Sequence, residues 1–328
     1  MRPVKIFAAA CTLLVGATLG QVASALADEP QKAILAHINI TASNWPAIVA
    51  QDKGYFLDEG LDIDWVQTGS SSGSAQQVMA GVANFGSSSM VDTFRAIDGG
   101  GDLVIFTNSI AMGLHSLVGA KELDSIDDLR GKRVMVGGQR DITGLWWYAM
   151  AEHYGIDPRE DVDLLFAGST ANRLSALMAG GVDAAVISPP NSFQAFEEGY
   201  SDLGLIATYM GEFPMMIYHV NKSWAAANDS AVVGFVRAHN RAVAYMLEPA
   251  NREDVSQILA DATGSSLEHA LRTYDMAIAA NAYIADGSIS EATVARVRSV
   301  LAEDGDLQEP LKSLEVFVDP TYFELARQ

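Results

Sequence analysis

Short apolar runs that alternate with helical patterns constrain the fold of this chain more than any other feature of its sequence. The first series begins near Ala33, and glycines such as Gly54 and Gly81 mark the ends of its helices. Its predicted elements are strands at 33–40, 61–67, 83–87 and 102–108 and helices at 46–53, 73–80 and 89–98. This alternation is typical of βαβ units, so it predicts an α/β lobe built on a mainly parallel sheet.

The same alternation restarts after a connection near 109–118, which indicates a second lobe of the same kind. Its predicted elements are strands at 132–136, 162–166, 183–187 and 203–207 and helices at 141–154 and 170–179. Residues 79–85 and 178–184 share the same order of helix end, glycine and strand start. This similarity indicates either an internal repeat or the usual form of a helix-to-strand junction.

Beyond Pro214 the pattern changes, because one strand-like run at 215–220 is followed only by helices. These helices are predicted at 229–247, 251–262, 266–274 and 290–302. A helical tail must pack on something, and the first lobe is its natural host if the chain crosses back at 210–216. We therefore predict two doubly wound α/β lobes joined by two crossings that form a hinge. The expected boundaries are 28–112 with 215–328 for lobe 1, and 113–214 for lobe 2.

The first 27 residues have the pattern of a secretory signal peptide. Arg2 and Lys5 precede an apolar stretch from Ile6 to Leu19, and Ala25-Leu26-Ala27 forms a cleavage site. The stretch is shorter than the roughly 20 residues that span a bilayer, so we expect cleavage and export to the periplasm. The only cysteine, Cys11, lies in this segment, so the exported chain is expected to contain no thiol.

Acidic residues outnumber basic ones by 41 to 21, which gives a formal net charge of -20. Such a surface repels nucleic acid and anionic lipid, so neither is expected as a partner. The sequence contains no H-x-x-x-H spacing, no calcium loop and no phosphate-binding G-x-x-x-x-G-K motif. We therefore expect no metal and no cofactor, and any basic residue near a cleft becomes informative.

Ligands of open α/β sheets bind beyond the carboxyl ends of the strands, where helix N-termini present unpaired N–H groups. Serine-rich loops at 69–73 and 86–89 follow two predicted strands, and their hydroxyls are candidates for ligand contact or for helix capping. In the loop at 41–46, which follows the first predicted strand, Trp45 either covers a ligand or belongs to the core. The predicted ligand-binding residues are Ser43, Asn44, Trp45, Ser70, Ser71, Ser87, Ser88, Asn108, Gln139, Arg140, Asp141, Thr143, Ser188, Pro189, Asn191 and Phe213.

Arg140 is the most informative cation of the predicted second lobe, because it lies directly before a helix that Asp141 can cap. A guanidinium in such a place can hold a planar anion with two hydrogen bonds, or it can be a surface charge that pairs with Asp141. This residue and the serine loops predict a small organic anion or zwitterion as the ligand. A neutral heterocycle stacked on Trp45 is the alternative.

Three segments resemble a known family, the sulfonate, taurine, nitrate and thiamine-precursor group of periplasmic binding proteins of ABC importers. They are Lys53–Ile63, Ser125–Val136 with its sequence DLRGKRV, and Leu177–Ala185 with its L-x-x-G-x-V-D-A pattern. The resemblance covers essentially the whole chain after the signal segment. It implies a type II periplasmic binding fold with a discontinuous first lobe, a ligand in the cleft between the lobes, and an ABC permease of the inner membrane as partner.

Two enzyme alternatives accompany this interpretation. The same group includes a thiamine-pyrimidine synthase with a cysteine-rich motif, which this chain lacks. Residues 69–73 match the G-x-S-x-G nucleophile elbow of serine hydrolases, with Ser71 as the nucleophile, but none of the histidines lies in a matching motif. We therefore expect a monomeric binding protein without catalytic activity.

Overall fold

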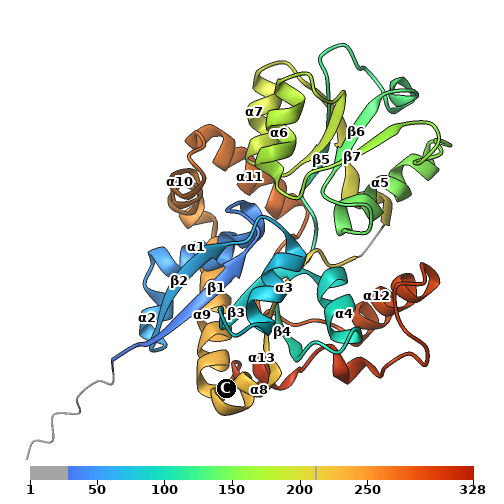
Figure 1. Ribbon diagram of the computed structural model, residues 1–328. Coiled ribbons are helices and arrows are strands. Elements are labelled where there is room, and N and C mark those ends of the chain that lie inside the picture. The colour runs from blue at the N-terminus through green and yellow to red at the C-terminus, as the bar shows by residue number, and fades with distance from the viewer. Residues whose placement is uncertain (1–28, 211–212) are drawn as a thin grey trace, which may run out of the picture.

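The computed structural model describes residues 29–210 and 213–328, and it contains two mixed sheets, each covered by helices (Figure 1). The two-lobed α/β architecture predicted from the alternating pattern is confirmed. The predicted signal peptide at 1–27 lies outside the described residues. None of the helices in the described ranges is long and apolar enough to cross a membrane.

The sheet of the first lobe has the strand order β2-β1-β3-β10-β4. β1 pairs in parallel with β2 and β3, whereas β10 is antiparallel to both β3 and β4. A strand that comes after the second lobe in the sequence is thus inserted between two strands of the first series. The bounds are β1 Gln31–His37, β2 Leu61–Gln67, β3 Phe85–Ser89, β4 Leu103–Ile110 and β10 Met216–Asn221.

The sheet of the second lobe has the equivalent order, β7-β6-β8-β5-β9. Here β5 is the inserted antiparallel strand, because it pairs with β8 and β9. β5 overlaps the connection predicted near 109–118, and that prediction is wrong there because four residues between two loops carry too little pattern to be recognised as a strand. The bounds are β5 Ser116–Gly119, β6 Arg133–Val136, β7 Asp163–Phe166, β8 Ala184–Ile187 and β9 Ser201–Leu205.

Several helices of the described residues follow a strand and begin with a side-chain cap. Ser70, Ser89 and Ser169 each accept a hydrogen bond from the backbone N–H three residues later, and Asp141 accepts from Thr143 and Gly144. These caps hold the N-termini of the helices at the carboxyl ends of the strands. The helices of the two lobes are α1 Trp45–Asp52, α2 Tyr55–Asp58, α3 Ser71–Met79, α4 Met90–Asp98, α5 Ile142–His153, α6 Thr170–Met178 and α7 Asn191–Glu197.

The helical tail packs on the first lobe, as predicted from its apolar pattern (Figure 1). Phe235 of α9 lies against Phe85 with ring centroids 4.7 Å apart, and Phe94 of α4 stacks on Phe317 at 4.2 Å. The tail helices are α8 Lys222–Ala227, α9 Asp229–Leu247, α10 Arg252–Thr263, α11 Leu267–Ala279, α12 Glu291–Glu303 and α13 Thr321–Leu325. Short 3₁₀ helices lie at Ala42–Asn44, Ile126–Leu129, Ile206–Met210, Pro249–Asn251 and Leu314–Val316.

Acid is expected to destabilise this fold through its buried histidines. Burial lowers the pKa of His219 to about 3 and that of His239 to about 4, so both are neutral in the folded chain and take up protons more readily when it unfolds. The free energy of unfolding should therefore fall between about pH 6.5 and pH 4, by up to about 1.4 kcal/mol per pH unit for each histidine. Urea unfolding across this range measures the slope. His239→Gln should reduce it, whereas His153→Gln, at an exposed position, should not.

Candidate ligand-binding site

A cavity of about 180 Å³ lies between the two lobes, where the carboxyl ends of strands from both sheets meet. This is the place at which open α/β sheets bind ligands. The backbones of the two lobes approach closely beside it, since a Cβ added to Gly168 would lie 2.7 Å from the carbonyl oxygen of Gly69. The loops and strand ends that line the cavity contribute, among others, Asn39, Ser70, Ser89, Gly137, Gly168 and Ser188.

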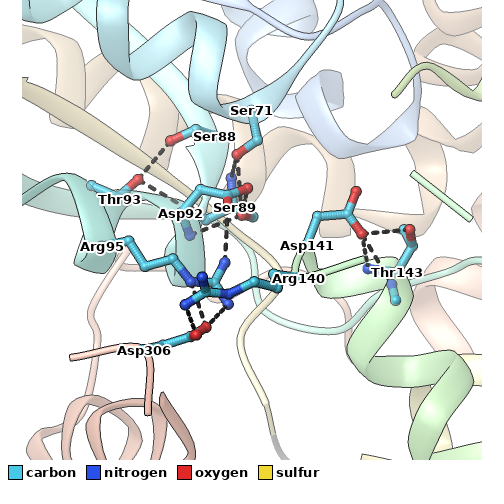
Figure 2. Close-up of polar contacts among 11 residues, drawn as sticks. Ser71, Ser88, Ser89, Asp92, Thr93, Arg95, Arg140, Asp141, Thr143 and Asp306 are labelled. Carbon is cyan, nitrogen blue, oxygen red and sulfur yellow. Dashed lines mark hydrogen bonds and ion pairs between the residues drawn. The ribbon is translucent and has the colours of Figure 1, made fainter. Parts of the chain in front are cut away.

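The wall from the first lobe is a network of hydroxyls that ends on a carboxylate (Figure 2). Ser71 Oγ accepts from the Ser89 backbone N–H at 2.8 Å and donates to Ser89 Oγ at 3.1 Å. Ser89 Oγ in turn donates to Asp92 Oδ2 at 2.7 Å. The Ser71 proton is therefore directed at another serine, and no histidine of the described residues bonds to it. This arrangement does not activate Ser71 as a nucleophile.

The first loop of this lobe is held by residues that are distant in sequence. Asn44 Nδ2 donates to Ser87 Oγ at 3.0 Å, Ser109 Oγ donates to the Ser43 carbonyl at 2.8 Å, and Tyr283 Oη donates to the Ala42 carbonyl at 2.7 Å. Strands β3 and β4 and the helical tail thus fix the positions of Ser43 and Asn44 at the cavity. A loop anchored in this way is prepared for binding before a ligand arrives.

The wall from the second lobe contains a buried cation, Arg173 of α6, whose residue is only 2% exposed. Its Nε donates to the Val186 carbonyl at 2.5 Å, and its Nη1 donates to the carbonyls of Ala167 at 2.8 Å and Gly168 at 3.0 Å. Its Nη2 donates to Thr170 Oγ1 at 3.1 Å. A guanidinium has five N–H donors, so one remains free of these bonds. No carboxylate among residues 29–210 and 213–328 forms an ion pair with it.

Burial shifts the pKa values of two side chains in this wall, Arg173 and His115. Burial lowers the pKa of Arg173 to about 10, while Asp141 opposes the shift, so the guanidinium remains charged at neutral pH. Burial, with a smaller contribution from Arg173, lowers the pKa of His115 to about 3, so this imidazole is neutral. Its Nδ1 is buried without a hydrogen-bond partner in the structure. The cavity therefore combines one fixed positive charge with the carboxyl groups of Asp92 and Asp141, a neutral ring and many hydroxyls.

Seven of the sequence-predicted site residues line this cavity. They are Ser43, Asn44, Ser70, Ser71, Asp141, Thr143 and Ser188. Ser87 and Ser88 lie behind the wall, where Ser87 bonds to Asn44 and Ser88 lies 2.6 Å from Thr93 Oγ1. The structure does not place Asn108, Pro189, Asn191 or Phe213 among the lining residues.

Trp45 and Arg140 are in different places from those expected. Trp45 is fully buried, and its Nε1 donates to the Val255 carbonyl of α10 at 2.9 Å, so its ring belongs to the core. Arg140 is 62% exposed and forms an ion pair with Asp306 beside a separate cavity, which Gln139 also lines. Neither side chain lines the cavity that contains Ser70, Asp141 and Arg173. The cation there is Arg173, which lies in the predicted helix at 170–179 and was not among the predicted ligand-binding residues.

Comparison with known proteins decides the family, because the family described as NMT1/THI5 like matches residues 42–252, more than half of the chain. This protein belongs to the NMT1/THI5-like family.

In the part of the chain that the structure describes, no group of three or more histidine, cysteine, aspartate or glutamate side chains is arranged to hold a metal ion.

By their names, two relatives of this NMT1/THI5-like chain are a binding protein and an enzyme. It is 25% identical over 228 residues to YtlA of Bacillus subtilis (strain 168), and the matched region covers 66% of each chain. It is 26% identical over 215 residues to 4-amino-5-hydroxymethyl-2-methylpyrimidine phosphate synthase of Candida albicans (strain WO-1), covering 62% of this chain and 63% of the synthase. The chain thus matches about two thirds of the length of these curated relatives.

The fold of this NMT1/THI5-like chain is that of a periplasmic binding protein. The alkanesulfonate-binding protein SsuA of Xanthomonas axonopodis pv. citri, solved with bound MOPS, superposes with a TM-score of 0.74 at 17% identity. The match covers 89% of this chain and 99% of SsuA. The type II periplasmic binding architecture expected from the resemblance is therefore confirmed.

Proposed function

We propose that this protein is the solute-binding component of an ABC importer and that it binds a small organic anion or zwitterion in the cavity between its lobes. The proposal includes export through the signal segment at 1–27, a monomeric state, delivery of the ligand to an inner-membrane permease, and no catalysis. The observation that supports the ligand class most directly is Arg173, a buried charged guanidinium at the cavity with no carboxylate partner among the described residues.

The buried guanidinium of Arg173 favours an anion as the ligand. A buried cation that forms no ion pair is unfavourable, and a bound sulfonate or carboxylate would supply a directly paired charge. Hydroxyls of Ser70 and Thr170 and the capped helix N-termini would donate to its oxygens. Contacts from both lobes with one ligand would favour the closed arrangement over an open one.

The test begins with the full-length gene expressed in a Gram-negative host. We expect the protein in the periplasmic fraction with Asp28 as its first residue, and native mass spectrometry of this material should reveal any ligand that copurifies. Calorimetric titration would then compare ethanesulfonate, MOPS, nitrate and acetate. Binding of at least one anion, recovered chemically unchanged, is the expected result.

Two outcomes of this test would contradict the proposal. The pyrimidine synthase among the relatives makes 4-amino-5-hydroxymethyl-2-methylpyrimidine the appropriate neutral probe. Binding of this pyrimidine without binding of any anion would replace the proposed ligand class by the neutral alternative. Turnover of 4-nitrophenyl acetate that is lost in Ser71→Ala would show a hydrolase instead.

A further inference from the structure

An ion-pair bridge joins the two lobes outside the cavity, between Arg140 of the second lobe and Asp306 of the helical tail (Figure 2). We propose that this pair is a latch that stabilises the closed arrangement and slows release of the ligand, although neither residue touches the ligand. The inference rests on the proposed binding function. It assigns Arg140 a positioning role in place of the ligand contact predicted from the sequence.

The half of the latch on the first lobe is rigid. The Asp306 side chain is only 4% exposed, and its Oδ2 accepts from Arg95 Nε of α4 at 2.7 Å. The segment that carries it is fixed to the end of α4, because Gln308 N–H donates to Asp98 Oδ2 at 2.7 Å and Lys312 Nζ donates to the Ile97 carbonyl at 3.0 Å. Asp306 therefore stays in place whatever the position of the second lobe.

Arg140, the half of the latch on the second lobe, can dissociate from Asp306. Arg140 is 62% exposed and directly precedes Asp141, the cap of α5. When the lobes separate, its guanidinium can return to water, while Asp306 keeps Arg95 as a partner. The open arrangement leaves no buried charge without a partner. The latch can therefore break and reform without the large free-energy cost of an unpaired buried ion.

Hydrogen bonds connect the latch to the cavity wall. Arg95 Nη1 donates to Asp92 Oδ1 at 3.1 Å, and Asp92 also accepts from Ser89, which bonds to Ser71 (Figure 2). Asp92 and Ser71 line the cavity. One guanidinium, that of Arg95, thus holds both the carboxylate at the cavity and the carboxylate of the latch.

A second contact between the lobes limits the size of the expected effect. At α7 and α11, Glu197 Oε2 lies 2.9 Å from His269 Nε2, and the Arg272 guanidinium lies over the Phe193 ring at 4.4 Å. This contact is independent of Arg140 and remains when the latch is removed. Loss of the latch should therefore weaken closure without abolishing it.

The experiment compares wild type with Arg140→Gln and Arg140→Lys. Arg140→Gln should raise the dissociation rate constant of ethanesulfonate, followed by stopped-flow tryptophan fluorescence, about two- to fivefold, and Arg140→Lys should restore part of the difference. The wild-type rate should increase with NaCl, because salt screens an exposed pair, and the rate of Arg140→Gln should respond less. X-ray scattering of ligand-free protein at low salt should show a larger radius of gyration for Arg140→Gln.

Arg252→Gln is the matched control, since Arg252 is an exposed arginine whose ion pair with Asp275 lies within the tail. It should change neither the dissociation rate nor the radius of gyration. The latch is refuted if Arg140→Gln also changes neither quantity. If no anion binds to any variant, the proposed function fails, and the scattering comparison still decides whether Arg140 holds the lobes together.

Discussion

Replacing Arg173 by glutamine should weaken the binding of an anion by about 1.5–3 kcal/mol, or roughly 10- to 150-fold, because a charge-assisted hydrogen bond is lost at the cavity. Calorimetric titration of ethanesulfonate measures the difference. The variant should also be less stable by about 3 kcal/mol, since carbonyls of Ala167, Gly168 and Val186 lose buried donors. Urea unfolding measures this second effect, and binding is compared under conditions in which both proteins are folded.

Arg133→Gln is the control that changes the net charge of the same lobe equally. Arg133 pairs with Asp183 on the surface, with a side chain that is 41% exposed, so its replacement should leave the affinity unchanged. If folded Arg173→Gln binds ethanesulfonate as tightly as wild type, the guanidinium does not contact the anion. The proposed ligand class would then lose its main support.

Replacing Trp45 by alanine should lower the free energy of unfolding by about 3–5 kcal/mol, because a fully buried indole leaves a cavity in the core of the first lobe. The loss includes the hydrogen bond to the Val255 carbonyl and the edge contact with Tyr274, whose ring centroid lies 6.2 Å away. Urea unfolding gives the value. Trp65→Ala, at a half-buried position on β2, should cost less.

A milder variant separates the two roles considered for Trp45. Trp45→Phe keeps most of the ring but removes the indole donor, so it should reduce stability and leave the affinity for ethanesulfonate unchanged. A large loss of affinity in folded Trp45→Phe, with little loss of stability, would instead show that this ring covers the ligand.

Much of the fold could be predicted because, in long segments, the spacing of apolar residues shows which face of a helix or strand is buried. The predicted helices at 73–80 and 229–247 correspond to α3 and α9, and the strand-like run at 215–220 corresponds to β10. The position of β10 between β3 and β4 could not be predicted, because pairing in a sheet depends on contacts between distant segments. β5 was missed because its four residues carry too little pattern to predict a strand before its partners β8 and β9 are known.

The candidate site was predictable only where a local rule applies. Capping places Ser70 and Asp141 at helix N-termini, and these residues do line the cavity. The two arginines show the limit of such rules, because both lie beside a capped helix of the second lobe. Side chains within a helix lean toward its N-terminus, so Arg173 reaches back to the loop at 167–168, whereas Arg140 precedes its helix and extends outward.

The close approach of Gly168 to the carbonyl of Gly69 bears on how this protein can evolve. Any side chain at position 168 would push the two halves apart, because the backbone of the other lobe already occupies the space. New solute preferences can therefore arise by exchange of lining residues such as Ser43 or Thr170. A larger residue at position 168 would increase the distance between the lobes whichever solute is bound. Selection for tight binding should therefore retain glycine there.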